Sequence, residues 1–133
     1  VILFNCMEEI MCDELLLWRK FTFSSGLSKD VRLRASGVDN VLHDSLKKIR
    51  KIIDDYQNSQ DNFDKTKEVF SKAFSLFQTH TDLFSEFIDK YASQEWLNEN
   101  GYEEARKKYT SFYLTLTGGD LVDYIYKKEE NDN

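Results

Sequence analysis

The chain has 133 residues, of which 41% are hydrophobic and 32% are charged, and its formal net charge is −6. A chain of this length fits one domain, and its hydrophobic content is too high for a disordered protein. The acidic balance argues against nucleic acid as a partner, because phosphate binding needs a basic surface.

The N-terminal region predicts one helix from about residue 2 to residue 21. Apolar residues recur there at three- and four-residue steps: Phe4, Met7, Met11, Leu15 and Trp18. The sequence contains no proline, which favours long helices, because proline breaks helix interiors. Ser24, Ser25 and Gly26 predict a break. Residues 27–35 alternate apolar and basic side chains as a short strand does, but we expect a loop or a helical turn, since a lone strand has no partner.

A second helix is predicted from about Asp39 to Tyr56. Ser36 and Asp39 have the spacing of a capping box. The apolar residues that follow keep a 4,3,4,3 spacing, which is typical of a heptad seam: Leu42, Leu46, Ile49, Ile53 and Tyr56. Residues 58–62 form a short polar turn, so we expect the next helix to run antiparallel to this one.

An aromatic stripe occupies residues 63–91. It keeps heptad spacing if Thr81 fills the one polar position of the series Phe70, Phe74, Phe77, Phe84, Ile88 and Tyr91. Two interpretations are open: one helix runs through, or Thr79 and Asp82 cap a new helix after a break at 78–81. The unbroken register favours one helix, with a kink as an option.

Three shorter helical segments are expected after residue 91. The first, 93–100, ends before Gly101, which suits the C′ position of a helix. The second keeps 3,4,3,4 spacing through Tyr102, Ala105, Tyr109, Phe112 and Leu116. Gly118 and Gly119 stop it, and Asp120 is placed to cap a last helix that reaches residue 126.

These elements predict an all-α single-domain bundle over residues 1–126. The bundle has four to five principal helices around a long central antiparallel helical hairpin. Residues 127–133 are expected to form a charged flexible tail.

No pattern in the sequence predicts a catalytic, metal or cofactor site. Asp39 and His43 share a helix face and could supply two metal ligands, but the spacing suggests no third. His43 and His80 are each expected to be solvated or to cap a helix, and no catalytic partner is apparent for Cys6 or Cys12. We therefore predict that the protein is not an enzyme and has no cofactor.

Aromatic residues are the first candidates for a binding surface, because they are favoured anchors at protein interfaces. Most of the phenylalanines are assigned to the core. The candidate interaction surface consists of Trp96, Tyr102, Tyr109, Tyr113, Tyr124 and Tyr126. We predict a non-enzymatic helical protein-interaction or scaffolding module, whose partner is another protein or a second copy of the chain.

A basic patch is the second candidate, formed by Lys47, Lys48, Arg50 and Lys51. Its expected role is structural, with Lys47, Arg50 and Lys51 on a solvated helix face and paired to Asp54 and Asp55 at i,i+4 spacing. The alternative function is a bundle that binds a small apolar ligand, or an anionic membrane surface through this patch. An enzymatic function ranks last.

The two cysteines bear on localisation. Cys6 and Cys12 lie on different faces of one predicted helix, so no disulfide is expected between them, and this favours a reducing, cytoplasmic compartment. No apolar stretch reaches the length of a membrane span, and no signal peptide is predicted. The chain begins at Val1 rather than Met, as processed products and fragments do, which leaves the localisation open.

Overall fold

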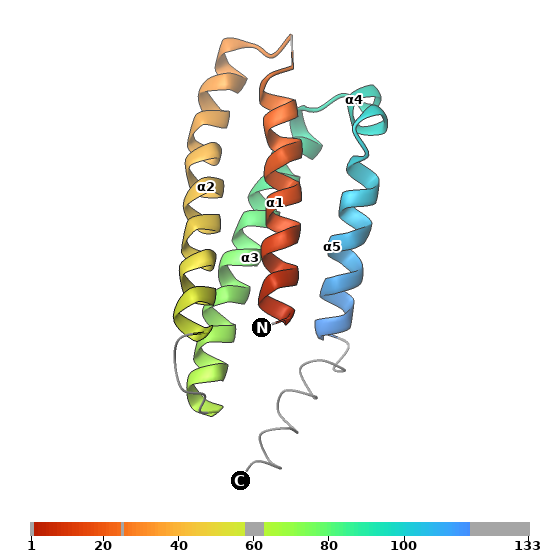
Figure 1. Cartoon of the computed structure of the whole chain (residues 1–133). Helices are drawn as coiled ribbons and strands as arrows, with labels where there is room; N and C mark the ends of the chain where they lie inside the picture. The colour runs from red at the N-terminus through yellow and green to blue at the C-terminus, as the bar shows by residue number, and fades with distance from the viewer. Residues whose placement is uncertain (1, 25, 58–62, 118–133) are drawn as a thin grey trace.

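The computed structural model describes residues 2–24, 26–57 and 63–117, and these residues form five helices and no strand (Figure 1). The helices are α1 (Ile2–Thr22), α2 (Lys29–Gln57), α3 (Phe63–Tyr91), α4 (Gln94–Glu99) and α5 (Tyr102–Thr117). The four long helices run alternately up and down, and the short α4 turns the chain at one end of the bundle. The predicted all-α bundle with a long α2–α3 hairpin is confirmed. Within the described residues, none of the helices combines the length and apolar character that crossing a membrane requires.

α1 packs against the three other long helices. Its buried seam residues are spaced by three and four: Phe4, Met7, Met11, Glu14, Trp18 and Phe21. The indole of Trp18 is fully buried, lies edge-on to Phe87 of α3 at 5.1 Å between ring centroids, and donates a hydrogen bond to Asp39 of α2 at 2.9 Å. One side chain thus joins three helices.

α3 is one continuous helix, as the unbroken register favoured. Thr81 lies fully buried in its seam, between Phe77 and Phe84, which are also fully buried. α5 packs on this face through aromatic rings: the centroids of Phe77 and Tyr109 are 5.4 Å apart, and those of Phe84 and Tyr102 are 5.9 Å apart.

The predicted start of the second helix is wrong, because α2 begins at Lys29 rather than near Asp39. Val31, Ala35, Val38 and Leu42 recur at steps of four, three and four and pack into the core, whereas Leu33 is exposed. In the sequence, the alternation of apolar residues with Arg32 and Arg34 resembles a strand and obscures this helical spacing. The cap is Ser28, whose hydroxyl accepts a hydrogen bond from the Val31 amide at 3.2 Å.

This cap can be tested against the one that the sequence suggested. Ser28→Ala is expected to lower the free energy of unfolding by about 0.5–2 kcal/mol, because it removes an acceptor for a helix N-terminal amide. Ser36→Ala is the matched control, since Ser36 lies exposed inside α2, and it should change stability by less than about 0.5 kcal/mol. Urea unfolding of both variants measures the difference, and equal losses would contradict the assignment.

The turns around α4 agree with the sequence. The Ser93 hydroxyl accepts a hydrogen bond from the Trp96 amide at 3.1 Å and caps the helix. Gly101 has φ +70° just beyond Asn100, the C-cap of α4, as expected of a C′ residue. The predicted helix over 120–126 and the tail over 127–133 lie outside the described residues.

Candidate functional site

A buried polar cluster lies between α1 and α3. Oε1 of Glu14 is 2.9 Å from Nδ1 of His80 and accepts a hydrogen bond from the Thr81 hydroxyl, also at 2.9 Å. Glu14 is 2% exposed, and His80 and Thr81 are fully buried. Because an ionised carboxylate only accepts, Nδ1 of His80 is the donor when Glu14 is ionised.

Two nitrogens near this level of the bundle have no partner among the described residues. They are Nε2 of His80 and Nη1 of Arg106, and both atoms are buried. Arg106 lies on α5, with its guanidinium 4.8 Å from the ring centroid of Tyr109. A histidine–carboxylate pair is the arrangement of a general base, but these side chains are buried among the helices of the described part of the chain.

Neither the role of Glu14 nor the burial of His80 was predicted from the sequence. A signal was present, because Met11 and Trp18 are one heptad apart and Glu14 stands at the seam position between them. Thr81 was recognised as the polar seam position of α3. The expectation that His80 is solvated or capping is wrong, because its imidazole is buried against Glu14.

A groove on the outer surface, here called the α1–α2 groove, has a volume of about 630 Å³. Each helix contributes residues at positions i, i+3, i+4 and i+7: Cys12, Leu15, Leu16 and Arg19 from α1, and His43, Leu46, Lys47 and Arg50 from α2. Leu15 and Leu46 are buried in its floor, whereas Leu16 is 57% exposed. The groove therefore combines an apolar floor with basic side chains and has no carboxylate among its lining residues.

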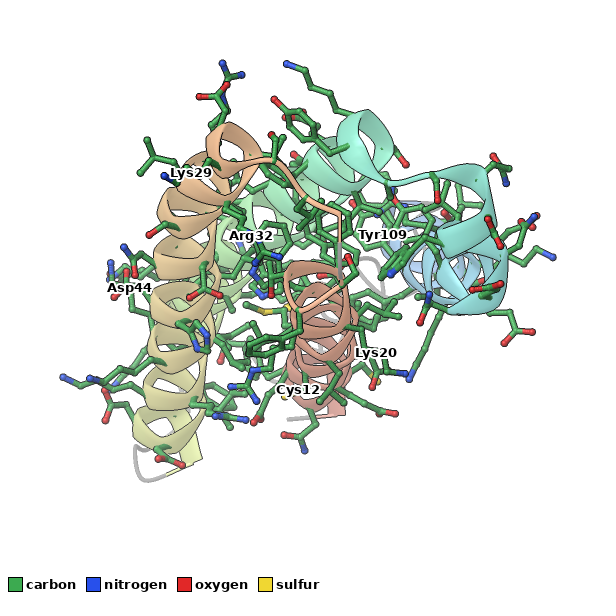
Figure 2. The ribbon with its side chains drawn as sticks, turned by 90° about the horizontal axis from the view of Figure 1, so that it is seen from above. Cys12, Lys20, Lys29, Arg32, Asp44 and Tyr109 are labelled. Carbon is green, nitrogen blue, oxygen red and sulfur yellow. The ribbon has the colours of Figure 1, made fainter. Side chains whose placement is uncertain are left out.

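The predicted basic patch is divided between two sides of α2. Lys47 and Arg50 line the α1–α2 groove, whereas Lys48 and Lys51 line a second groove beside α3. Figure 2 looks down the bundle and shows Asp44, which pairs with Lys48 at 2.8 Å, on the side of α2 that points away from α1. The four cations do not share one face.

The predicted pairing of these cations with Asp54 and Asp55 is wrong, because neither carboxylate forms an ion pair within the described part of the chain. Arg50 instead reaches across to Glu8 of α1 at 2.8 Å, and its Nη2 donates to the Cys12 sulfur at 3.3 Å. The packing of α1 beside α2 creates this pair, which spacing along one helix could not reveal.

The predicted aromatic surface largely packs inward. Trp96 is half-buried against Phe21, with ring centroids 5.4 Å apart. Tyr102 is buried, and Tyr109 and Tyr113 are half-buried and stacked on each other at 5.9 Å. Tyr124 and Tyr126 lie outside the described residues. The described members thus contact other aromatic rings of the bundle, and Tyr102 alone among them is buried.

Tyr102 is one of the contacts that join α5 to the rest of the bundle. Burial raises the pKa of its hydroxyl well above the usual value, and the hydrogen bond that it donates to Asp89 at 2.9 Å raises the pKa further. The neutral phenol is therefore the form that the folded protein keeps. Lys108 adds ion pairs from α5 to Glu9 and Asp13 of α1, at 2.8 and 3.0 Å.

The Asp39–His43 pair, considered above as two metal ligands, contacts Trp18 instead. Oδ1 of Asp39 accepts from the Trp18 indole and lies 3.5 Å from Nε2 of His43. Among the residues that the structure describes, no three histidine, cysteine or acidic side chains gather closely enough to hold a metal ion. Cys6 and Cys12 are free thiols.

Comparison with protein-family models, with curated proteins and with solved structures found no match to this chain.

Proposed function

We propose that this protein is a non-enzymatic helical protein-interaction module and that the α1–α2 groove is its binding surface. The supporting observation is Leu16, which is 57% exposed at the lip of a groove whose floor is leucine. An exposed leucine alone is ordinary, but one that extends an apolar groove rimmed by cations is the composition of a docking surface.

The other features argue for the same class of function. The histidine–carboxylate pair is buried, so it supports packing rather than catalysis. The division of the four cations between two sides of α2 gives a flat membrane surface no single basic face to meet. The free thiols of Cys6 and Cys12 are compatible with a reducing, cytoplasmic compartment, which is part of the proposal.

Site-specific photo-cross-linking in the source cells tests this function. A photoreactive phenylalanine analogue in place of the exposed Leu16 should form a discrete adduct with another protein chain. The same analogue in place of Asp44, on the side of α2 away from α1, is the matched control and should form none. Equal adducts at both positions, or none at position 16, would reject the groove as the binding surface.

A further inference from the structure

The pair of helices α1 and α2 has two sides, and within the described residues only one of them carries a third helix. α3 packs on that side, against both α1 and α2. The other side is the α1–α2 groove. Packed helices present ridges and grooves around their whole circumference, so the open side can accept a helix by the same geometry that seats α3. The first and last lining residues on each helix are seven positions apart, about 10 Å or two turns.

The charge of the groove restricts what can lie in it. The chain has a net charge of −6, yet this surface is lined by Arg19, Lys47, Arg50 and His43 and by no carboxylate. Glu8 engages Arg50 and Asp39 lies against His43. Arg19 and Lys47, one from each helix, form no ion pair in the described part of the chain. Two cations without an ion pair, one from each helix, therefore border the same apolar floor.

We infer that the α1–α2 groove binds an acidic amphipathic helix of a partner protein. The inference rests on the proposed function and specifies its partner. The apolar stripe of the incoming helix covers Leu16 and the leucine floor, and carboxylates on its two flanks pair with Arg19 and Lys47. Recognition of this kind places apolar anchors at i, i+3, i+4 and i+7 in a hydrophobic groove and lets the charged rim select the partner.

Cys12 provides a built-in reporter, because its thiol lines the groove. The probe is a capped synthetic helix of about 18 residues, with leucine at the a and d heptad positions and glutamate on both flanks. In the full chain carrying Cys6→Ser, this peptide should slow alkylation of Cys12 in a saturable manner. Its binding should weaken with added salt, because the contacts are between charges.

Two variants of adjacent lysines test the charge contact. Lys47→Glu should weaken binding of the probe about tenfold, because attraction at the rim becomes repulsion. Lys48→Glu is the matched control: it introduces the same charge one residue away, on the other side of α2, and should leave the affinity within about twofold. Equal losses in the two variants would overturn the specific groove.

The remaining outcomes distinguish other occupants. The inference fails if a probe with glutamine in place of glutamate binds equally well. It also fails if a peptide of residues 118–133 or vesicles of anionic lipid protect Cys12 and the designed probe does not. If the position-16 adduct forms in cells but the probe never protects Cys12, the interaction function survives and the acidic helix is excluded. If the adduct is absent as well, both proposals fail.

Discussion

His80→Leu is expected to lower the free energy of unfolding by about 3–5 kcal/mol, because it removes one of two partners of a buried carboxylate. Glu14 is 2% exposed and would keep only the Thr81 hydroxyl. Leucine fills a similar volume, so the loss reports the missing hydrogen-bond partner of a buried carboxyl group rather than a cavity. Urea unfolding monitored by circular dichroism measures this loss. The slope of the free energy of unfolding against urea concentration should be the same for the variant and the parent protein.

Two companion variants show whether polarity causes that loss. Replacing the whole cluster, as Glu14→Leu, His80→Leu and Thr81→Val together, should recover most of the stability, since no polar group of the cluster then lacks a partner. His43→Leu is the matched control, because that imidazole is partly exposed on α2, and it should cost less than about 0.5 kcal/mol. A triple variant as unstable as His80→Leu would mean that shape, not charge pairing, holds the α1–α3 contact.

Trp18→Ala is expected to lower the free energy of unfolding by about 3–5 kcal/mol, which is typical of deleting a large buried aromatic side chain. The indole is fully buried, meets the rings of Phe21 and Phe87, and bonds to Asp39. Its loss leaves a cavity where α1, α2 and α3 join. Thermal and urea unfolding should both detect the change.

The control for this position is Phe23, an aromatic residue just after α1 that is 84% exposed. Phe23→Ala should change stability by less than about 0.5 kcal/mol, since it removes no buried contact. Trp18→Phe should give an intermediate loss of about 1–2 kcal/mol, because the ring packing partly remains while the bond to Asp39 is lost. A loss as large for Phe23→Ala as for Trp18→Ala would contradict the described packing.

The accuracy of the sequence predictions depended on the range of the interaction involved. The seam of α2 from Leu42 to Ile53 and the continuity of α3 through Thr81 were predicted correctly, because both follow from residues three and four apart on one helix. The start of α2 was missed, because Arg32 and Arg34 between the apolar residues imitate the alternation of a strand. Val31, Ala35 and Val38 also have helical spacing, but only their packing against the core shows that this spacing, and not the alternation, is the structural one.

The candidate sites depended on contacts between helices. The four cations at 47–51 look like one patch along the chain, but successive positions on a helix point in different directions, so packing divides them between two grooves. The tyrosines predicted as a surface include Tyr102, which is buried against Phe84. An amphipathic helix does not state which of its faces another helix will cover.

The sequence by itself determined that the chain is helical, that α2 and α3 form an antiparallel hairpin, and most of the core, because apolar periodicity and short turns are local properties of the chain. Only the tertiary structure decided that Glu14 meets His80, 66 positions later in the chain, that Arg50 pairs with Glu8, and that one side of the α1–α2 pair is basic and carries no helix of the described residues. The physical reason is that burial and ion pairing depend on which helix faces lie together. The sequence pattern around a charged residue beside an apolar stripe is the same whether the folded protein buries that residue or exposes it.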